Sequence, residues 1–464
     1  MAVGALPGFR DFYPHEFAQR AHIFRAWREV ARRYAFSEYD GPLLEPLDLY
    51  TKKSGEEIVG QLYNFKDKGD RDVALRPEMT PTFARMVGAR ANALRKPVRW
   101  FSIPQLFRYE RPQRGRLREH FQLNVDIVGE ASELADAELL CVAIDIMKEL
   151  GLGPTDVRAR VSDRLLLNAL LTKIGVGSEQ VAAVFSVIDK VDRVSAAATE
   201  EKLAETGLNP SQIARIVGLT ARQTVETLKR DFGTDGELGV RFAAMDSYVA
   251  HLTALGVGDW IDLDLRIVRG LAYYTGIVFE LFDAKGELRA ICGGGRYDTL
   301  LESLGGANLP ALGFGMGDVV LGELLKERGL LAIPEGSGAD LFIVGGNGVL
   351  QHGIADALRL ASSLRAAGLS VDYSLNAEVY QTRASRNQVD GAKKSGARAA
   401  IYFDSESEVV VQGLIGKLND APKAIFPASP LLANDSAAVA ALMQWYKTNL
   451  TGSATGVPSL TPDA

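Results

Sequence analysis

The sequence predicts an α+β protein with two domains, and three observations lead to this prediction. Short β-rich runs between residues 73 and 130, such as VRWFSI and FQLNVDIVG, alternate with loops rich in Arg, Pro and Gly, which is typical of an antiparallel sheet. Strands return at 262–293 after a long stretch of helical periodicity. A linker rich in Gly, Pro and Ser at 333–338 then precedes a compact α/β pattern.

The first domain is expected to span residues 1–332, because a chain of 464 residues is too long for one ordinary core. Its first element is an amphipathic helix after Pro14, predicted by apolar residues at helical spacing, namely Phe24, Trp27, Ala31 and Tyr34. Further elements are a helix at 132–150, a strand at 155–161, a helical insertion at about 163–255, and a hairpin whose turn is Asp283-Ala284-Lys285-Gly286.

The second domain is expected at 339–450. Strand patterns ADLFIVG, LSVDYSL, ARAAIYF and EVVVQGL alternate there with two helical patterns, which favours a compact α/β unit. The final residues, 451–464, lack a hydrophobic pattern and are expected to be a disordered tail.

Composition excludes several classes of protein. The formal charge of −6 argues against coating nucleic acid by bulk attraction, although a local basic patch can still bind phosphates. The two cysteines, Cys141 and Cys292, lack CxxC spacing, and the five histidines form no HxH or HxxxH group, so no protein metal site is predicted. The sequence has neither a signal peptide pattern nor a run of 18 apolar residues, so a cytoplasmic protein without a membrane span is expected.

The densest chemical signal is FRYERPQRGRLREHFQLNVD, residues 107–126. Period two places Gln122, Asn124 and Asp126 on one face of a strand. Arginine forks suit phosphate oxygens, so this segment indicates a polyphosphate clamp over a polar patch, although a solvated charged hairpin fits the spacing equally well. The arginines of the segment are Arg108, Arg111, Arg114, Arg116 and Arg118.

Two further segments carry polar residues suited to a ligand. In LRPEMTP (75–81), Glu78 and Thr80 project to the same side if the segment is extended, and a turn braced by its two prolines is the structural alternative. In IVRGLAYYTGIVFE (267–280), an arginine, Arg269, precedes two neighbouring tyrosines that face opposite ways in a strand, Tyr273 and Tyr274. Strand aromatics are usually core residues, and only the nearby arginine indicates a site.

Glycine-rich runs occur at CGGGRYD (292–298) and GFGMGD (313–318). Neither fits a dinucleotide-binding or P-loop spacing between a strand and a helix. Both permit close approach of the backbone to a ligand.

Together and in this order, these segments resemble the class II aminoacyl-tRNA synthetases, and within them the histidyl-tRNA synthetase family. The resemblance covers nearly the whole chain. It implies a class II antiparallel-sheet catalytic domain with a helical insertion, and a C-terminal α/β anticodon-binding domain. The matching segments are GFRDFYP, a motif 1-like helix leading to Pro42, LRPEMTP, the motif 2 run FRYERPQRGRLREHFQ, RGLAYYTG, GGGRYD and the motif 3-like GFGMGD.

The resemblance also implies roles for individual residues. In ATP binding, Arg108 would hold the α-phosphate, Glu110 the adenine amino group and Arg116 the outer phosphates, with Phe121 stacked on adenine and Arg118 nearby. In histidine binding, Glu78, Thr80 and Gln122 would receive the ammonium group, while Asp126, Tyr273 and Tyr274 would address the imidazole. Arg269 would be the catalytic arginine beside the α-phosphate, and the tRNA acceptor end would meet Arg111, Gln113 and Arg114.

Two positions depart from the family pattern. Val320 stands where motif 3 usually has an arginine under the ATP phosphates, and Ala272 stands where many relatives have an acid. The contact to the γ-phosphate is therefore unassigned.

The implied partners are ATP, Mg²⁺, L-histidine, tRNA(His) and a second copy of the chain. Two alternatives are a histidine-sensing regulatory paralogue of ATP phosphoribosyltransferase and an RNA-binding module without catalysis. The missing motif 3 arginine favours the first alternative. Arg269, the C-terminal domain and the segment from Arg108 to Arg118, which we call the arginine loop, oppose it. The acidic balance opposes the second.

Overall fold

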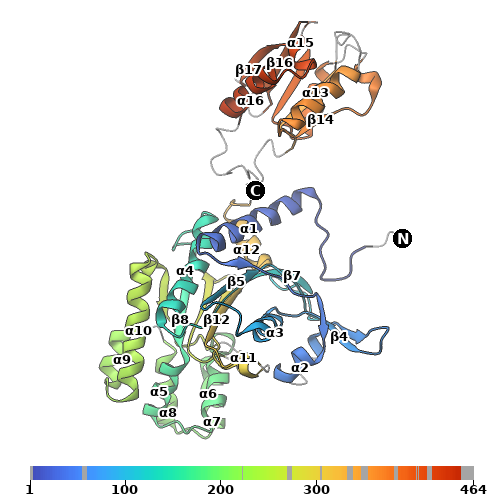
Figure 1. Cartoon of the computed structure of the whole chain (residues 1–464). Helices are drawn as coiled ribbons and strands as arrows, with labels where there is room; N and C mark the ends of the chain where they lie inside the picture. Colours follow the sequence, from blue (N-terminus) through green and yellow to red (C-terminus); the bar gives the residue numbers. More distant parts are fainter. Residues whose placement is uncertain are drawn as a thin grey trace. The chain divides into compact units, whose positions relative to one another are not determined.

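The structure is a computed structural model that describes residues 4–54, 60–221, 223–268, 274–303, 306–331, 338–345, 354–380, 385–403, 405, 407–414 and 421–450. The chain divides into two compact units, residues 1–332 and 333–464 (Figure 1). Each unit has its own hydrophobic core among the described residues. None of the helices described is long and apolar enough to cross a membrane.

The first unit is built on one large sheet. Its middle strands pair antiparallel, as the sequence predicts, while the two edge pairs, β1 with β5 and β8 with β9, are parallel. β6 (Gln105–Phe107) pairs with β7 beside this path. The strand order is β1 (Ser37–Glu38), β5 (Val98–Ser102), β7 (Glu119–Val128), β12 (Ala311–Gly317), β11 (Cys292–Arg296), β10 (Ile277–Asp283), β8 (Val157–Asp163) and β9 (Ile261–Leu263).

Helices cover one face of this sheet. α1 (Pro14–Arg33) starts at a proline that suits the first helical turn, and its Trp27 is fully buried. α4 (Glu133–Glu149) packs on β7, β11 and β12, and α12 (Asp318–Glu327) packs on β7 and β12 (Figure 1). The predicted helices at 14–34 and 132–150 are thus confirmed.

The opposite face of the large sheet carries polar residues and is covered by mostly shorter elements. A small three-stranded sheet lies here beside the helices α2 (Asp48–Ser54), α3 (Thr80–Arg90) and α11 (Leu300–Ser303). The strand order of the small sheet is β2 (Leu44–Pro46), β4 (Asp72–Leu75) and β3 (Asn64–Lys66).

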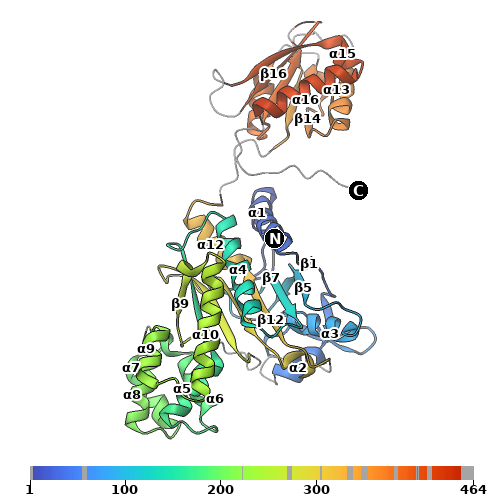
Figure 2. The same ribbon diagram turned by 60° about the vertical axis from the view of Figure 1, so that its left-hand side comes forward.

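A helical insertion separates β8 from β10, although these two strands are neighbours in the sheet, as the sequence predicts. Side-chain caps begin several of its helices, such as Asp163 before α5 and Asn209 with Gln212 at α8. Figure 2 shows these helices gathered at one end of the sheet. The elements are α5 (Arg164–Ile174), α6 (Val181–Ile188), η2 (Val191–Arg193), α7 (Ala196–Glu205), α8 (Pro210–Leu219), α9 (Val225–Phe232), α10 (Glu237–Ala254) and η3 (Gly258–Trp260).

The predicted hairpin is longer at its tip than the sequence suggests. The turn at Asp283 exists, because the amide of Gly286 donates to its carbonyl at 2.9 Å. The β10–β11 ladder, however, closes only at Leu281 and Cys292. The connection at 284–291 therefore extends beyond a tight turn, and it carries Arg289.

The second unit is a five-stranded α/β sheet in the order β14 (Val371–Tyr373), β13 (Leu341–Val344), β15 (Ala399–Phe403), β16 (Glu408–Gly413) and β17 (Lys423–Pro427), counted over its described residues. The sequence predicted its first four strands and missed β17 and the last two helices. Residues 333–337 of the predicted linker and the tail at 451–464 lie outside the described residues. The helices are α13 (Ile354–Ala366), η4 (Ala377–Tyr380), α14 (Ser385–Lys394), α15 (Ala428–Leu432) and α16 (Ser436–Leu450).

Candidate functional site

Strand β7 divides core from site by simple alternation. Leu123, Val125 and Ile127 are buried in the main core against the helices. Gln122 and Asp126 project to the other face, as period two predicts. The polar patch is therefore built on a central strand, where the backbone is held by neighbours on both sides.

These polar residues line a small cavity of about 80 Å³, which we call the histidine cavity. Five of the seven residues that the sequence assigned to histidine binding meet here: Glu78, Thr80, Gln122, Asp126 and Tyr274. The other two, Arg269 and Tyr273, lie outside the described residues, as does Ala272.

The LRPEMTP segment reaches this cavity in an unexpected way. The sequence suggested an extended segment, but Met79 has right-handed helical backbone angles, and α3 begins at Thr80. Pro81 suits this first turn because a proline there forfeits no helical hydrogen bond. The carbonyl of Pro77 accepts a hydrogen bond from Nε of Arg108 at 3.0 Å, so this segment also positions the first arginine of the loop.

Asp126 is the buried acid at the base of the histidine cavity. Its side chain accepts a hydrogen bond from the hydroxyl of Tyr297, and both residues line the cavity. Burial raises the pKa of Asp126 to about 7, with the Tyr297 hydrogen bond acting in the opposite direction. Tyr297 was not assigned from the sequence, although GGGRYD in strand β11 was the signal that contained it.

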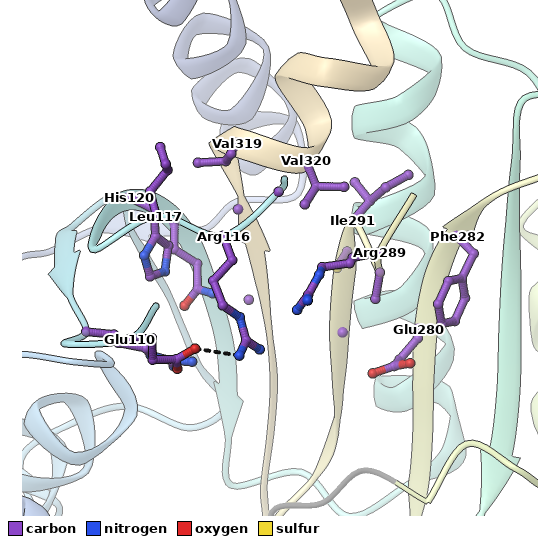
Figure 3. Close-up of a pocket in the computed structure, with 18 of the residues that line it drawn as sticks. Glu110, Arg116, Leu117, His120, Glu280, Phe282, Arg289, Ile291, Val319 and Val320 are labelled. Atoms are coloured by element: carbon purple, nitrogen blue, oxygen red, sulfur yellow. Dashed lines mark ion pairs between the residues drawn. The ribbon is translucent and has the colours of Figure 1, made fainter. Parts of the chain in front are cut away.

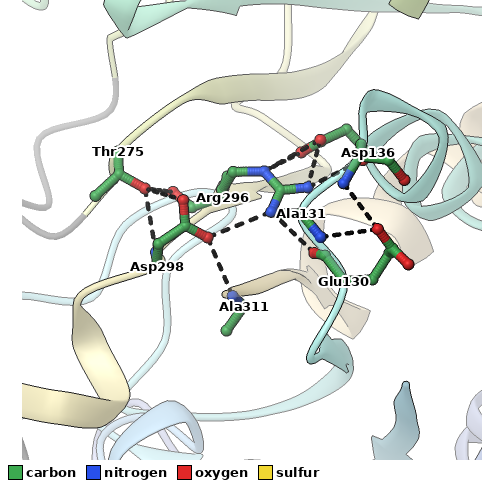
Figure 4. A network of polar contacts seen from close by, with 8 residues as sticks. Glu130, Ala131, Asp136, Thr275, Arg296, Asp298 and Ala311 are labelled. Atoms are coloured by element: carbon green, nitrogen blue, oxygen red, sulfur yellow. Dashed lines mark hydrogen bonds and ion pairs between the residues drawn. The ribbon is translucent and has the colours of Figure 1, made fainter. Parts of the chain in front are cut away.

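Polar contacts hold the two residues beside Tyr297, which are Arg296 and Asp298 (Figure 4). The preceding residue, Arg296, is 7% exposed and lies 2.6 Å from the carboxylate of Asp136 on α4. It also donates to two backbone carbonyls in the loop before α4 and lies 3.3 Å from Asp298. Because both neighbours of Tyr297 are held, its hydroxyl has a defined direction toward Asp126.

Glycines make the floor of the histidine cavity. A Cβ at Gly313 would lie 2.1 Å from Oδ1 of Asp126, and a Cβ at Gly315 would lie 2.8 Å from the side-chain amide carbon of Gln122. Any larger residue at either position would occupy the space of a side chain that lines the cavity. This is the physical reason for glycine in the GFGMGD run of β12.

A larger cleft of about 710 Å³ adjoins the histidine cavity, and we call it the nucleotide cleft. Arg108, Gln122, Gly293 and Gly315 line both spaces, so a ligand in one would touch a ligand in the other. Glu110 and Arg116 line the cleft and form an ion pair of 2.5 Å (Figure 3). Other lining side chains include His120, Arg193, Glu280, Arg289, Ile291 and Val320.

The structure corrects the adenine-stacking role given to Phe121. Its ring lies on the core face of β7, 5.3 Å from the ring of Phe24, and Arg20 lies over it at 4.5 Å. His120 lines the nucleotide cleft instead, because adjacent residues in a strand face opposite ways. Burial, followed by the neighbouring Arg108, lowers the pKa of His120 to about 3, so its imidazole ring is neutral at physiological pH.

Arg118 is also turned away from the nucleotide cleft, contrary to its predicted ATP contact. Its guanidinium lies 4.3 Å from the centre of the Tyr109 ring, and its Nε donates to the carbonyl of Glu110 at 3.1 Å. Arg118 therefore braces the loop from behind.

The tip of the arginine loop is a tight turn. Gln113 and Arg116 exchange two backbone hydrogen bonds of 2.9 Å, and Gly115 between them has a φ of +72° that favours glycine. Arg114 lies 2.5 Å from Glu327 on α12, so the turn is tied to that helix. Arg111 is exposed.

The GFRDFYP segment ties the arginine loop strand to α12. Arg10 lies 2.6 Å from Glu119 of β7 and 2.9 Å from Asp318 at the start of α12. Asp318 also accepts a hydrogen bond from the amide of Phe121 at 2.9 Å. Two buried carboxylates, from segments nearly 200 residues apart, thus share one guanidinium.

The described residues contain no group of three or more His, Cys, Asp or Glu side chains placed to hold a metal ion. Within the nucleotide cleft, the carboxylates are Glu110 and Glu280. The cleft is therefore suited to a metal that arrives with its own oxygen ligands.

Comparison with known proteins identifies the family to which this chain belongs. A family model described as histidyl-tRNA synthetase matches residues 8–317. A histidine–tRNA ligase of Opitutus terrae is 44% identical over 402 residues, which cover 86% of this chain and 90% of that protein. The chloroplastic/mitochondrial histidine–tRNA ligase of Arabidopsis thaliana is 41% identical, covering 80% of this chain and 75% of that protein.

Solved structures show the same fold. The crystal structure of histidyl-tRNA synthetase from a Nostoc species superposes with a TM-score of 0.78 at 22% identity, covering 94% of this chain and 100% of that one. A structure from Bacillus halodurans described as an ATP phosphoribosyltransferase regulatory subunit/histidyl-tRNA synthetase has a TM-score of 0.69 at 22% identity, covering 86% of this chain and 97% of that one. From its family match and its close relatives, this chain belongs to the histidyl-tRNA synthetase family.

Proposed function

We propose that this chain is a histidine–tRNA ligase, which activates L-histidine with ATP to histidyl-adenylate and pyrophosphate and then transfers histidine to the 3′ end of tRNA(His). One observation carries the proposal beyond family membership. The histidine cavity and the nucleotide cleft adjoin at Arg108 and Gln122, so an amino acid and a nucleotide would meet at an arginine. That is the arrangement adenylate formation requires.

The histidine cavity suits an amino acid with a basic side chain. Glu78, Thr80 and Gln122 offer oxygen acceptors for the ammonium group. Asp126 offers a carboxylate to an imidazole N–H, and Tyr274 closes the same wall. Because these polar groups would be stranded without matching partners, a ligand lacking the imidazole would be rejected by about 10⁴-fold or more.

The nucleotide cleft suits ATP. Arg108 stands at the junction, where the α-phosphate would lie, and Arg116 lies further out for the outer phosphates. Glu110 would accept from the adenine amino group, which requires it to exchange its present ion pair with Arg116 for that contact. His120 replaces Phe121 in our assignment as the ring against adenine.

The first step needs positive charge more than a protein base. The α-carboxylate of histidine has a pKa of roughly 3.5 and is already a nucleophile at neutral pH. It forms a bond to the α-phosphorus, and the bond from that phosphorus to the bridging oxygen breaks, releasing pyrophosphate. Arg108 would stabilise the charge that builds on the α-phosphate, and the sequence adds Arg269 as the second such cation.

Mg²⁺ would accompany ATP and neutralise the charge of its outer phosphates. Glu280, a carboxylate lining the nucleotide cleft, is the side chain suited to hold it, because Mg²⁺ prefers a few carboxylates together with phosphate oxygens and water.

In the second step, the terminal ribose hydroxyl of the tRNA attacks the histidyl carbonyl, the bond from that carbonyl to the phosphate oxygen breaks, and AMP leaves with its phosphate taking up the hydroxyl proton. We assign the acceptor end to the exposed side of the arginine loop, with Arg111 and Gln113, and the anticodon to the second unit. Arg114 is ion-paired to α12, so its contribution would be to hold the loop. A homodimer formed through the α1 region and a cytoplasmic location complete the proposal.

Histidine-dependent exchange of labelled pyrophosphate into ATP tests the first step, and charging of tRNA(His) tests the second. Both should be observed with the purified chain. A regulatory paralogue would bind histidine without exchange, so absence of exchange in a folded, histidine-binding sample would contradict the proposal.

A further inference from the structure

Helix α12 contributes a valine, Val320, to the nucleotide cleft at a position where an arginine would contribute a positive charge. Val320, in the first turn of α12, is 8% exposed and lines the cleft. Its Cγ2 lies 3.2 Å from the position of a Cβ built on Gly115. The valine therefore packs against the turn of the arginine loop, at the position where the family pattern has an arginine.

An arginine from another element stands beside this valine. Arg289 belongs to the connection between β10 and β11, and its guanidinium reaches into the cleft opposite Arg116, below Val320 (Figure 3). Its Cδ lies 3.7 Å from the same Cβ position on Gly115. Arg289 and Val320 thus approach the same turn from two neighbouring elements. Arg289 can therefore supply, at this place, the positive charge that Val320 lacks.

The surrounding charge is arranged for an anion. Arg116, Arg193 and Arg289 all line the cleft. The Arg289 side chain is exposed, and the pKa of its guanidinium is lowered by partial desolvation and then by the nearby Arg116 and Arg193, with Glu110 opposing them. Within the described part of the chain, Arg289 has no ion-pair partner, whereas Arg116 is paired with Glu110. An arginine without an ion-pair partner, beside two further arginines, favours an anionic ligand.

We propose that Arg289 binds the γ-phosphate of ATP and thereby replaces the arginine that Val320 displaces from α12. This inference rests on the proposed function, because it takes ATP to be the ligand of the nucleotide cleft. The lining residues support the γ-phosphate over the α-phosphate, because Arg108 lines both cavities, whereas Arg289 lines only the cleft.

The test is Arg289→Gln, with Lys285→Gln as the matched control. Lys285 is an exposed cation on the same connection and does not line the cleft. Loss of a charge-assisted hydrogen bond to phosphate should raise the KM for ATP about 10- to 100-fold in pyrophosphate exchange. The KM for histidine should stay within about twofold, and Lys285→Gln should match the unmodified chain.

A second readout separates the outer phosphates from the rest of the substrate. Transfer of histidine from preformed histidyl-adenylate to tRNA should be unchanged in Arg289→Gln, since the adenylate has no β- or γ-phosphate. Adding Val320→Arg to Arg289→Gln should recover most of the ATP affinity, because it returns a cation to the same space. A double variant as weak as Arg289→Gln would argue that the two positions do not serve one phosphate.

Two outcomes overturn the inference. One is an ATP KM in Arg289→Gln within about twofold of the control. The other is a raised KM for tRNA with an unchanged KM for ATP, which would assign Arg289 to the nucleic acid backbone. If the unmodified chain itself shows no exchange, the proposed function fails, and calorimetric titration of ATP into both proteins still decides whether Arg289 binds its phosphates.

Discussion

Asp126 is buried, lines the histidine cavity and has a raised pKa. The pKa of its carboxyl is raised to about 7 by burial, so the neutral form predominates below pH 7 and the carboxylate above it. Only the carboxylate has both oxygens free of protons, to accept from Tyr297 and from an imidazole N–H together. Histidine affinity should therefore rise as the pH increases through about 7.

The corresponding variant is Asp126→Asn, which keeps the shape and removes the charge. We expect the KM for histidine to rise about 10- to 100-fold, from loss of a charge-assisted hydrogen bond. The KM for ATP should hardly change. In pH profiles of kcat/KM for histidine, the inflection near 7 should disappear in the variant, while the titration of free histidine, common to both proteins, remains. Equal effects on both substrates would place Asp126 outside the histidine site.

At the residue scale, the alternation of side chains along strand β7 predicted correctly which residues face the cavity, whereas the family resemblance did not do so for Phe121. Gln122 and Asp126 were placed on one face of β7 by alternation, and they line the histidine cavity. The same alternation puts Phe121 on the core face, but the family analogy assigned it to adenine. The neighbouring residue, His120, lines the nucleotide cleft, so the role proposed for the aromatic ring against adenine moves by one residue along the strand.

Gly315 in β12 leaves room for the side-chain amide of Gln122 on the neighbouring strand, so a substitution at Gly315 tests whether the position of this amide matters. A methyl group there would lie 2.8–3.0 Å from three atoms of the Gln122 amide, which is the far end of a flexible side chain. Gly315→Ala should move this amide away from the histidine ammonium and raise the KM for histidine about tenfold or more. The free energy of unfolding should change by less than about 1 kcal/mol.

The control for this variant is Gly322→Ala in α12. Its nearest neighbour would be Cδ1 of Ile23 at 3.8 Å, so the methyl group has room, and the change should stabilise the helix by about 0.5–1 kcal/mol. Steady-state kinetics and urea unfolding of both variants separate the two effects. An unchanged KM for histidine in Gly315→Ala would mean that Gln122 does not contact the amino acid.

The Arg10 contact between β7 and α12 is a stability feature with a defined pH dependence. Glu119 and Asp318 are 1% and 3% exposed at their side chains, and Arg10→Met would leave both without their guanidinium. Breaking such a pair costs about 3–5 kcal/mol. The loss should lie near the lower end, because Arg10 is 26% exposed.

The sign of the pH dependence follows from Asp318. Burial already holds its pKa above the ordinary value, and Arg10 opposes that shift, so the variant raises the pKa further. A group whose folded pKa is raised destabilises the fold as it ionises. The deficit of Arg10→Met in urea unfolding should therefore be largest near pH 8 and shrink toward pH 5. Arg32→Met, which removes an exposed ion pair with Glu29, should cost much less than Arg10→Met at either pH, because solvent screens an exposed pair.

Element prediction failed mainly where tertiary packing decides. The helices at 14–34 and 132–150 have strong periodicity and were predicted. The LRPEMTP segment was expected to be extended, yet α3 begins within it, because its two prolines fit the start of a helix as well as a turn. The α12 position of Val320 could be read from the sequence, but its neighbour Arg289 could not, since only the fold brings the β10–β11 connection to the arginine loop.

The whole molecule consists of two units that differ in what they contain. All the described residues that line the histidine cavity and the nucleotide cleft belong to the first unit. The second has a separate core of residues between Leu341 and Leu450. The composition of the linker and the change to alternating strand and helix patterns predicted this division. That residues as far apart as 78 and 297 line one site could be expected only from the resemblance to a known family.

This separation predicts that the two reaction steps respond differently to truncation. A chain ending at residue 332 keeps its core and both cavities, so histidine-dependent pyrophosphate exchange should remain within about threefold of the full chain, with cooperative unfolding as the check on folding. Charging of tRNA(His) should fall on the order of a hundredfold or more, because two linked binding units gain that much over one. The sharpest comparison uses tRNA with an altered anticodon: the full chain should discriminate against it, and the truncated chain should charge both tRNAs equally slowly. Equal discrimination by both proteins would assign anticodon recognition to the first unit and contradict the role proposed for the second.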